Sequence, residues 1–177
     1  EPVIIKGLIN HWKLAEQGRQ SDIHAINYLK SHYNGCPSNA CIGSPDIKGR
    51  FFYNEERTQL NYDSRKMRID EVLDLIQESF DKENPNSYYI ASNVIDTHFP
   101  DFRRENDIVI PRPETDMAME DLRISIWIGN RTIACCHYDA SDNLACCVVG
   151  KRRFTLFPPD QIANLYPGPL TPTPGGQ

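Results

Sequence analysis

The sequence predicts a mixed fold, mainly β with α, in which helices lie in the N-terminal part and strands dominate the C-terminal part. Apolar residues recur at spacings of three and four from Ile69 to Phe80, which is the period of an amphipathic helix. Every second residue from Leu122 to Ile128 is Leu or Ile, which is the period of a strand with one buried face. Further strand-like runs with turn residues between them continue to Phe157.

The N-terminal half alternates between strand and helix patterns. We expect a strand, a helix, a strand, a second helix and a strand over residues 2–9, 21–32, 51–53, 69–80 and 88–91. Ser21 and Asp22 are favourable residues for the start of the first helix. Asn84, Pro85 and Asn86 end the second helix, because proline cannot continue it.

The C-terminal half begins with a loop and continues as strands. Residues 96–121 contain three prolines and many charges, which predicts a loop. We expect strands over 122–128, 133–139, 143–149 and 152–157, with Gly150 and Lys151 as a hairpin turn. Residues 160–165 are expected to form a helical turn, and the tail from Pro167 a loop.

The composition fits one globular domain and disfavours two classes of partner. The chain has 177 residues and a net charge of -5, whereas nucleic-acid-binding proteins usually carry a basic excess. A membrane-spanning helix needs about 18 consecutive apolar residues, and no apolar run in the sequence approaches that length. No secretory signal pattern opens the sequence. We therefore expect a cytoplasmic protein that binds neither nucleic acid nor a membrane, with a homodimer left open.

Six cysteines are present, and four of them form the adjacent pairs Cys135–Cys136 and Cys146–Cys147 inside apolar runs. Cysteines in such runs are typically small buried apolar residues rather than ligands or bridges. Cys36 and Cys41 have no second pair that would complete a zinc site. The pattern favours a reducing compartment and disfavours a disulfide scaffold.

The triplet His137-Tyr138-Asp139 is the strongest candidate for a metal-binding or catalytic motif in the sequence. Residues i and i+2 of a strand project from the same face, so an imidazole and a carboxylate there could bind one metal ion together. These two donors are the beginning of the two-histidine, one-carboxylate triad of iron enzymes. Alone, such a triplet is a weak signal.

Arg152 offers a second candidate, since strand parity places it on the same side as Phe154 and Leu156. If that side faces a barrel interior, Arg152 is a buried cation that needs an anion beside it. A bound dicarboxylate would supply that anion. The alternative is that residues 151–153 form a solvated hairpin tip.

The run HYDASDNLACCVVGKRRFTLFPPDQIANLYPGPL resembles the JmjC-type cupin-like (cupin 8) family, and the opening PVIIKGLINHW is similar to its entry strand. The resemblance extends to the Fe(II)- and 2-oxoglutarate-dependent oxygenases related to the asparaginyl hydroxylase that inhibits hypoxia-inducible factor. It implies a double-stranded β-helix, a jelly-roll barrel with N-terminal helices.

The resemblance also implies roles for individual residues. His137 and Asp139 match the first two iron ligands. Arg152 matches a basic residue that pairs with the distal carboxylate of 2-oxoglutarate, and Asn143 matches an asparagine near the other end of that cosubstrate. Tyr89 is similar to a tyrosine that hydrogen-bonds the same distal carboxylate. Ala134 replaces a threonine found in some relatives, which leaves nearby Thr132 as a substitute.

The third ligand of the family is a histidine well downstream of the triplet, and none follows here. The remaining histidines, at positions 11, 24, 32 and 98, all precede the triplet and are interpreted as structural or solvated. A jelly roll needs about eight strands. We therefore expect that the third ligand and the C-terminal strands lie beyond Gln177, and that the sequence is trimmed at both ends.

By resemblance, the function is hydroxylation or demethylation of an unknown substrate with Fe(II) and 2-oxoglutarate. Members of the family act on protein side chains, methyl-lysine or tRNA, and the acidic balance disfavours the last. Two alternatives remain. One is an inactive cupin-like module that binds a small acid or peptide, and the other is a cupin enzyme that does not use 2-oxoglutarate.

Overall fold

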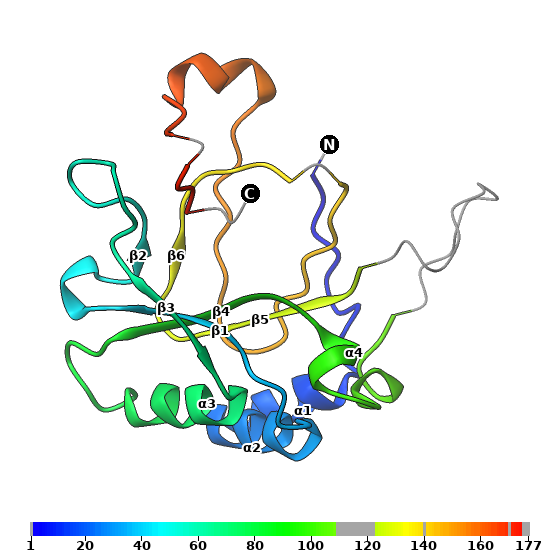
Figure 1. Cartoon of the computed structure of the whole chain (residues 1–177). Helices are drawn as coiled ribbons and strands as arrows, with labels where there is room; N and C mark the ends of the chain where they lie inside the picture. Colours follow the sequence, from blue (N-terminus) through cyan, green and yellow to red (C-terminus); the bar gives the residue numbers. More distant parts are fainter. Residues whose placement is uncertain (1, 109–122, 140, 170, 175–177) are drawn as a thin grey trace.

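The protein forms an antiparallel sheet with helices packed on one of its faces (Figure 1). The structure is a computed structural model, and it describes residues 2–108, 123–139, 141–169 and 171–174. The helices α1, α2 and α3 lie together beneath the sheet, and the other face looks toward a second, smaller sheet and most of the C-terminal part (Figure 1). The expected mixture of strands and N-terminal helices is therefore present.

Two adjoining helices open the described chain. The helix α1 spans Lys13–Gln20, and α2 spans Asp22–His32. Ser21 ends the first and starts the second, because its hydroxyl accepts a hydrogen bond from the backbone of His24. The sequence predicts α2 with its cap but misses α1, whose eight residues include only two that are buried.

The helix α3 spans Ile69–Glu78 and confirms the clearest apolar period of the sequence. Ile69, Val72, Leu73 and Ile76 are all buried against the sheet. Glu71 accepts a hydrogen bond from the backbone of Arg68 and completes the start of the helix. Phe80 lies two residues beyond the helix and is 38% exposed, so it does not extend the buried stripe.

The main sheet has the strand order β3-β1-β4-β5, and every neighbouring pair is antiparallel. The strands span Ser38–Gly43 (β1), Asp63–Met67 (β3), Ser87–Val94 (β4) and Ser125–Gly129 (β5). The strand β4 is central to the site, because Tyr89 lies opposite Cys41 of β1 and opposite Gly129 of β5. The expected strands 88–91 and 122–128 are thus confirmed in type, although Leu122 lies outside the described residues.

A second sheet pairs β2, Arg50–Phe51, with β6, Ile133–Ala134, in parallel. Short helical segments complete the fold: α4 (Ile95–His98) and the 3-10 turns Pro45–Ile47, Phe102–Arg104 and Pro159–Asn164. The last of these matches the helical turn expected over 160–165. The segment expected as a loop over 96–121 contains α4 and a 3-10 turn, and its residues 109–122 lie outside the described part.

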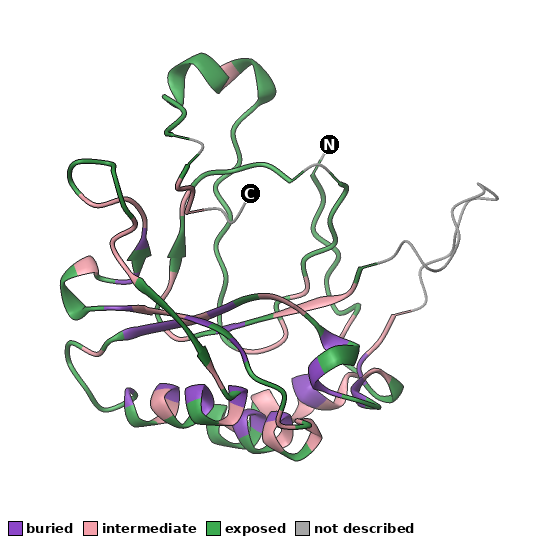
Figure 2. Ribbon diagram, viewed as in Figure 1, coloured by how far each residue is buried: buried purple, intermediate pink, exposed green. Residues whose placement is uncertain are grey.

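Buried residues gather between the helices and the sheet, whereas the C-terminal part is mostly exposed (Figure 2). Phe99, Ile69 and Ile90 are among the side chains that are fully buried there. Within the described residues, no helix is both long enough and apolar enough to cross a membrane.

Four strand predictions are wrong in whole or in part. Residues 2–9, 143–149 and 152–157, which the sequence predicts as strands, carry no strand. Of the strand expected over 133–139, only Ile133 and Ala134 form one. A strand is stabilised by backbone hydrogen bonds to a neighbouring strand. Among the described residues, these apolar segments have no partner strand beside them. Period and apolar content predict the side-chain pattern of a strand but cannot supply its partner.

Candidate metal centre

His137 and Asp139 lie just after β6, in a segment without regular secondary structure. Their donor atoms nevertheless face each other, with His137 Nε2 3.9 Å from Asp139 Oδ1. Both side chains are partly exposed, at 38% and 58%. The sequence thus predicts the pairing, but the strand geometry on which the prediction rests is absent.

A backbone contact fixes which nitrogen of His137 is available. His137 Nδ1 lies 2.8 Å from the carbonyl oxygen of Cys135, and a carbonyl can only accept, so Nδ1 carries the proton. The lone pair of the neutral ring is then on Nε2, the atom that faces Asp139. Metal-binding histidines are typically held in this way by a hydrogen bond at the other nitrogen.

Asn143 orients the carboxylate of Asp139. Its Nδ2 donates to Asp139 Oδ2 at 2.9 Å and to the carbonyl oxygen of Ser141 at 3.2 Å. The second carboxylate oxygen, Oδ1, is the one that faces His137. Asn143, expected from the resemblance near the cosubstrate, is therefore next to the carboxylate of the candidate metal pair.

The two donors fit a divalent cation as part of a larger ligand set. Neighbouring ligands about 2.1 Å from a metal are about 3.0–3.4 Å apart, so a turn of these partly exposed side chains by less than about 1 Å would bring the 3.9 Å pair to ligand spacing. An imidazole with a carboxylate suits iron, manganese or zinc. In the described ranges, no three His, Cys, Asp or Glu side chains converge to hold a metal ion, so the structure brings together two ligands of the expected three.

The other histidines do not approach this pair as ligands. His24 and His32 hydrogen-bond within and around α2, and His11 is exposed in a turn. His98, expected among charged loop residues, is instead 8% exposed in α4, where Nδ1 lies 3.2 Å from the carbonyl oxygen of Cys36.

Arg152 lies at the surface, which contradicts the expectation of a buried cation and agrees with the alternative of a solvated hairpin tip. Its predicted side is correct, because the guanidinium carbon is 4.7 Å from the ring centre of Phe154. Burial raises the pKa of the Tyr89 phenol, and the positive charge of Arg152 acts in the opposite direction. Arg152 is therefore close enough to act electrostatically on Tyr89, the residue expected to share its carboxylate.

Thr132 and Tyr89 meet around Gly129. A methyl group built on Gly129 would lie 3.1 Å from Thr132 Cγ2 and 3.1 Å from Tyr89 Cδ2. Only a residue without a side chain fits between them. The six predicted side chains thus form two groups, one of His137, Asp139 and Asn143 and one of Tyr89, Arg152 and Thr132.

Sequence reasoning misses the aromatic and sulfur side chains beside Tyr89. The ring of Phe51 lies 5.7 Å from that of Tyr89 and 5.0 Å from that of Tyr62. Burial raises the pKa of the Tyr62 phenol to about 12, and Cys41 and Cys135 shift it in the same direction. The alternation in β1 and the contact between β2 and β6 bring these residues together, and neither is visible as a local motif.

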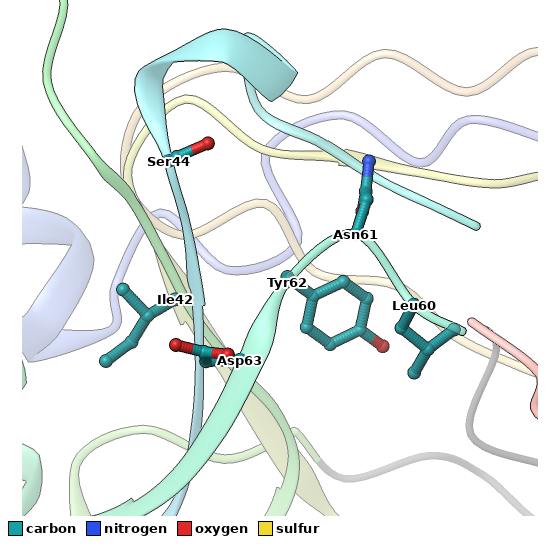
Figure 3. Close-up of a pocket in the computed structure, with 6 residues that line it drawn as sticks. All are labelled: Ile42, Ser44, Leu60, Asn61, Tyr62 and Asp63. Carbon is teal, nitrogen blue, oxygen red and sulfur yellow. The ribbon is translucent and has the colours of Figure 1, made fainter. Parts of the chain in front are cut away.

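A shallow pocket of about 230 Å³ adjoins Tyr62 at the edge formed by β1 and β3 (Figure 3). The Tyr62 ring and Leu60 lie on one side of this pocket, and Ile42 and Asp63 lie on the other (Figure 3). Asn61 at its rim accepts from the Phe52 backbone and donates to the Arg50 carbonyl, so its amide supports the loop.

All six cysteines are free thiols, and none of them is buried. Cys41, Cys135 and Cys146 are half-buried, and the other three are exposed. The burial expected for the two adjacent pairs is wrong, because the apolar runs that contain them form no sheet layer that would cover them.

The sequence as a whole matches one known domain family. The match is to the cupin-like domain and extends over residues 1–177. The chain belongs to the cupin-like domain family. This finding confirms the fold class, since the antiparallel sheet with its helices is consistent with a jelly-roll-like architecture.

Curated relatives of this cupin-like domain contain JmjC domains. JmjC domain-containing protein D of Dictyostelium discoideum is 30% identical over 181 residues, which covers 94% of this chain and 37% of that protein. JmjC domain-containing protein E of the same organism is 27% identical over 179 residues, covering 94% and 48%. Jumonji C domain-containing protein 5 of Drosophila melanogaster is 28% identical over 114 residues, covering 59% and 28%.

The predicted JmjC-type affiliation is confirmed by these relatives, whereas the likeness to an asparaginyl hydroxylase stays a prediction. The cupin-like domain spans less than half of the length of each relative named above. No solved structure matches the chain.

Proposed function

We propose that the cupin-like domain is part of an Fe(II)- and 2-oxoglutarate-dependent oxygenase. The observation that carries this proposal is the facing pair of donor atoms, His137 Nε2 and Asp139 Oδ1. Each is held by a contact at the other end of its group, from Cys135 or from Asn143. The JmjC-type family to which the chain belongs includes 2-oxoglutarate oxygenases and demethylases.

In this proposal, His137 and Asp139 hold the iron, which when bound activates oxygen for attack on a C–H bond. The Cys135 carbonyl keeps the proton of His137 on Nδ1, so that Nε2 is ready to bind a cation. The neutral amide of Asn143 donates a hydrogen bond to Asp139 Oδ2, which leaves Oδ1 available for the metal. A second histidine ligand, as in the family, is part of the proposal.

The second group of side chains would anchor the cosubstrate. Arg152 offers a guanidinium that matches the distal carboxylate of 2-oxoglutarate, and the Tyr89 hydroxyl lies within its electrostatic reach. Burial favours the neutral phenol of Tyr89, which can donate a hydrogen bond to a carboxylate. Thr132 would offer a further hydroxyl beside Tyr89.

The substrate is a protein, a peptide or another small molecule, and it is either hydroxylated or demethylated. A nucleic-acid substrate is disfavoured by the net charge of -5. We place the protein in the cytoplasm.

The test is formation of succinate from 2-oxoglutarate by the full-length protein with Fe(II), ascorbate and a broad peptide panel. We expect iron-dependent succinate, and a KM for 2-oxoglutarate at least tenfold higher in Arg152→Ala. The neighbouring Arg153→Ala serves as the matched control, because Arg153 is equally exposed but is not among the charges that act on Tyr89.

Two results would overturn parts of the proposal. Binding of 2-oxoglutarate without succinate under all conditions would favour an inactive binding module. An unchanged KM in Arg152→Ala would remove that residue from the cosubstrate site.

A further inference from the structure

Gly18 occupies an unusual place in the fold, the interior of the helix α1. Glycine destabilises a helix interior by about 1 kcal/mol relative to alanine. Its backbone is ordinary, so conformation does not require glycine there. The space around it does: a methyl group on Gly18 would lie 2.8 Å from Val149 Cγ2 and 3.3 Å from Val149 Cγ1.

Val149 is one of the few anchors of a long exposed segment. Val148 and Val149 pack against the hydrophobic core, while residues 151–157 are all exposed. None of the described residues between 141 and 157 belongs to a strand. The segment therefore depends on the contact of Val148 and Val149 with the core for its position.

Arg152 follows this anchor closely in the chain. Gly150, at φ +78°, turns the backbone directly after Val149. Consecutive Cα atoms are about 3.8 Å apart, so three residues reach at most about 11 Å. The position of Val149 therefore limits where Arg152, whose charge acts on Tyr89, can lie.

We propose that Gly18 is a positioning residue for Arg152. Because Gly18 has no side chain, Val149 can lie against α1. This contact fixes the start of the turn at Gly150 and thereby the position of the Arg152 guanidinium. The structural part of the inference stands on the contact between Gly18 and Val149. Its consequence for 2-oxoglutarate rests on the proposed function.

A side chain on Gly18 would have to displace Val149. Carbon atoms prefer a separation of about 3.5–4.0 Å, so the 2.8 Å contact requires a shift of about 1 Å. Val149 is β-branched and has little rotamer freedom with which to avoid the clash. Charge-assisted hydrogen bonds of arginine are about 2.7–2.9 Å long, so a displacement of this size matters at Arg152.

The first experiment follows Tyr89 in the metal-free chain and needs no activity. The chain is labelled with 3-fluorotyrosine, the Tyr89 signal is assigned with Tyr89→Phe, and its pKa is measured by fluorine NMR. We expect the pKa of Tyr89 to rise in Gly18→Val, because Arg152 moves away, and to rise similarly in Arg152→Ala. Cys41, the other titratable group that acts on Tyr89, is unchanged in both variants.

The second experiment measures the affinity of the full-length protein for 2-oxoglutarate. We expect Gly18→Val to raise Kd at least tenfold and Gly18→Ala to raise it about threefold. The double variant Gly18→Ala/Val149→Ala should return to within twofold of wild type, because the shortened Val149 makes room for the new methyl group. Gln17→Ala, the neighbouring change in the same helix, is the matched control and should leave Kd unchanged.

The outcomes separate this inference from the proposed function. A Tyr89 pKa that is the same in Gly18→Val and wild type, while Arg152→Ala shifts it, would overturn the role of Gly18. A wild-type protein that does not bind 2-oxoglutarate at all would overturn the proposed function, and the NMR result would still decide the inference.

Discussion

At the scale of single residues, the candidate centre depends on how two side chains are turned. Neither His137 nor Asp139 is held by burial, since both are partly exposed. Their directions come instead from the Cys135 carbonyl and the Asn143 amide. Such supporting contacts typically change metal affinity by 10- to 100-fold when they are removed, on the order of one to three kcal/mol.

Asn143→Ala should therefore weaken iron binding by about tenfold in the full-length protein, because Asp139 loses the hydrogen bond that turns Oδ1 toward His137. Dialysis against Fe(II) without oxygen measures the change. Asn164→Ala removes an exposed amide that bonds only Gln161 among the described partners, and it serves as the control. Equal affinities in all three proteins would show that Asn143 does not orient the carboxylate.

Tyr62 gives a prediction for the dependence of stability on pH. Its folded pKa of about 12 exceeds the ordinary value of 10.0, so the folded state keeps the phenol proton after the unfolded state has lost it. The stabilisation is therefore complete below pH 10 and is lost as the pH rises toward 12. Thermal unfolding between these pH values should show a steeper fall in Tm for wild type than for Tyr62→Phe.

The control for this experiment is Tyr166→Phe, because Tyr166 is 85% exposed. It should follow the wild-type curve. A Tyr62→Phe curve that also coincides with wild type would mean that the Tyr62 phenol is not stabilised in its neutral form.

At the scale of elements, local patterns predict what local forces stabilise. The caps and apolar period of α2 and α3 are written in neighbouring residues, and both helices are found within two residues of their expected ends. The strand β4 is found as well, and β5 is confirmed within its described residues. The strands expected over 143–149 and 152–157 fail because their existence depends on partners distant in sequence.

The buried stripe of α3 can be tested by comparing two of its expected members. Leu73→Ala should lower the free energy of unfolding by about 2–5 kcal/mol, since Leu73 is 2% exposed and its loss leaves a cavity. Phe80→Ala should cost about 1 kcal/mol or less, because Phe80 lies outside the helix and is 38% exposed. Urea denaturation measures both, and similar costs would place Phe80 in the core after all.

At the scale of the whole molecule, the main sheet has the hydrophobic core on one face and the candidate functional site toward the other. The helices and the core occupy one face, and the small sheet of β2 and β6 and most of the C-terminal part, which contains the candidate ligands and Arg152, lie toward the other (Figure 1, Figure 2). The sequence predicts His137 and Asp139 as a pair and places Arg152 on the side of Phe154, both of which the geometry shows. It could not predict the contact of Gly18 with Val149, because this contact joins residues that are distant in sequence.

The central claim is that His137 and Asp139 together bind the iron of an oxygenase, and metal binding by the full-length protein tests it most directly. Dialysis with Fe(II) without oxygen is compared for wild type, His137→Ala and Asp139→Ala, with the exposed His11→Ala as control. We predict one iron per wild-type and control chain, and at least a hundredfold weaker binding in each of the other two variants. Undiminished iron binding after either substitution would contradict the account.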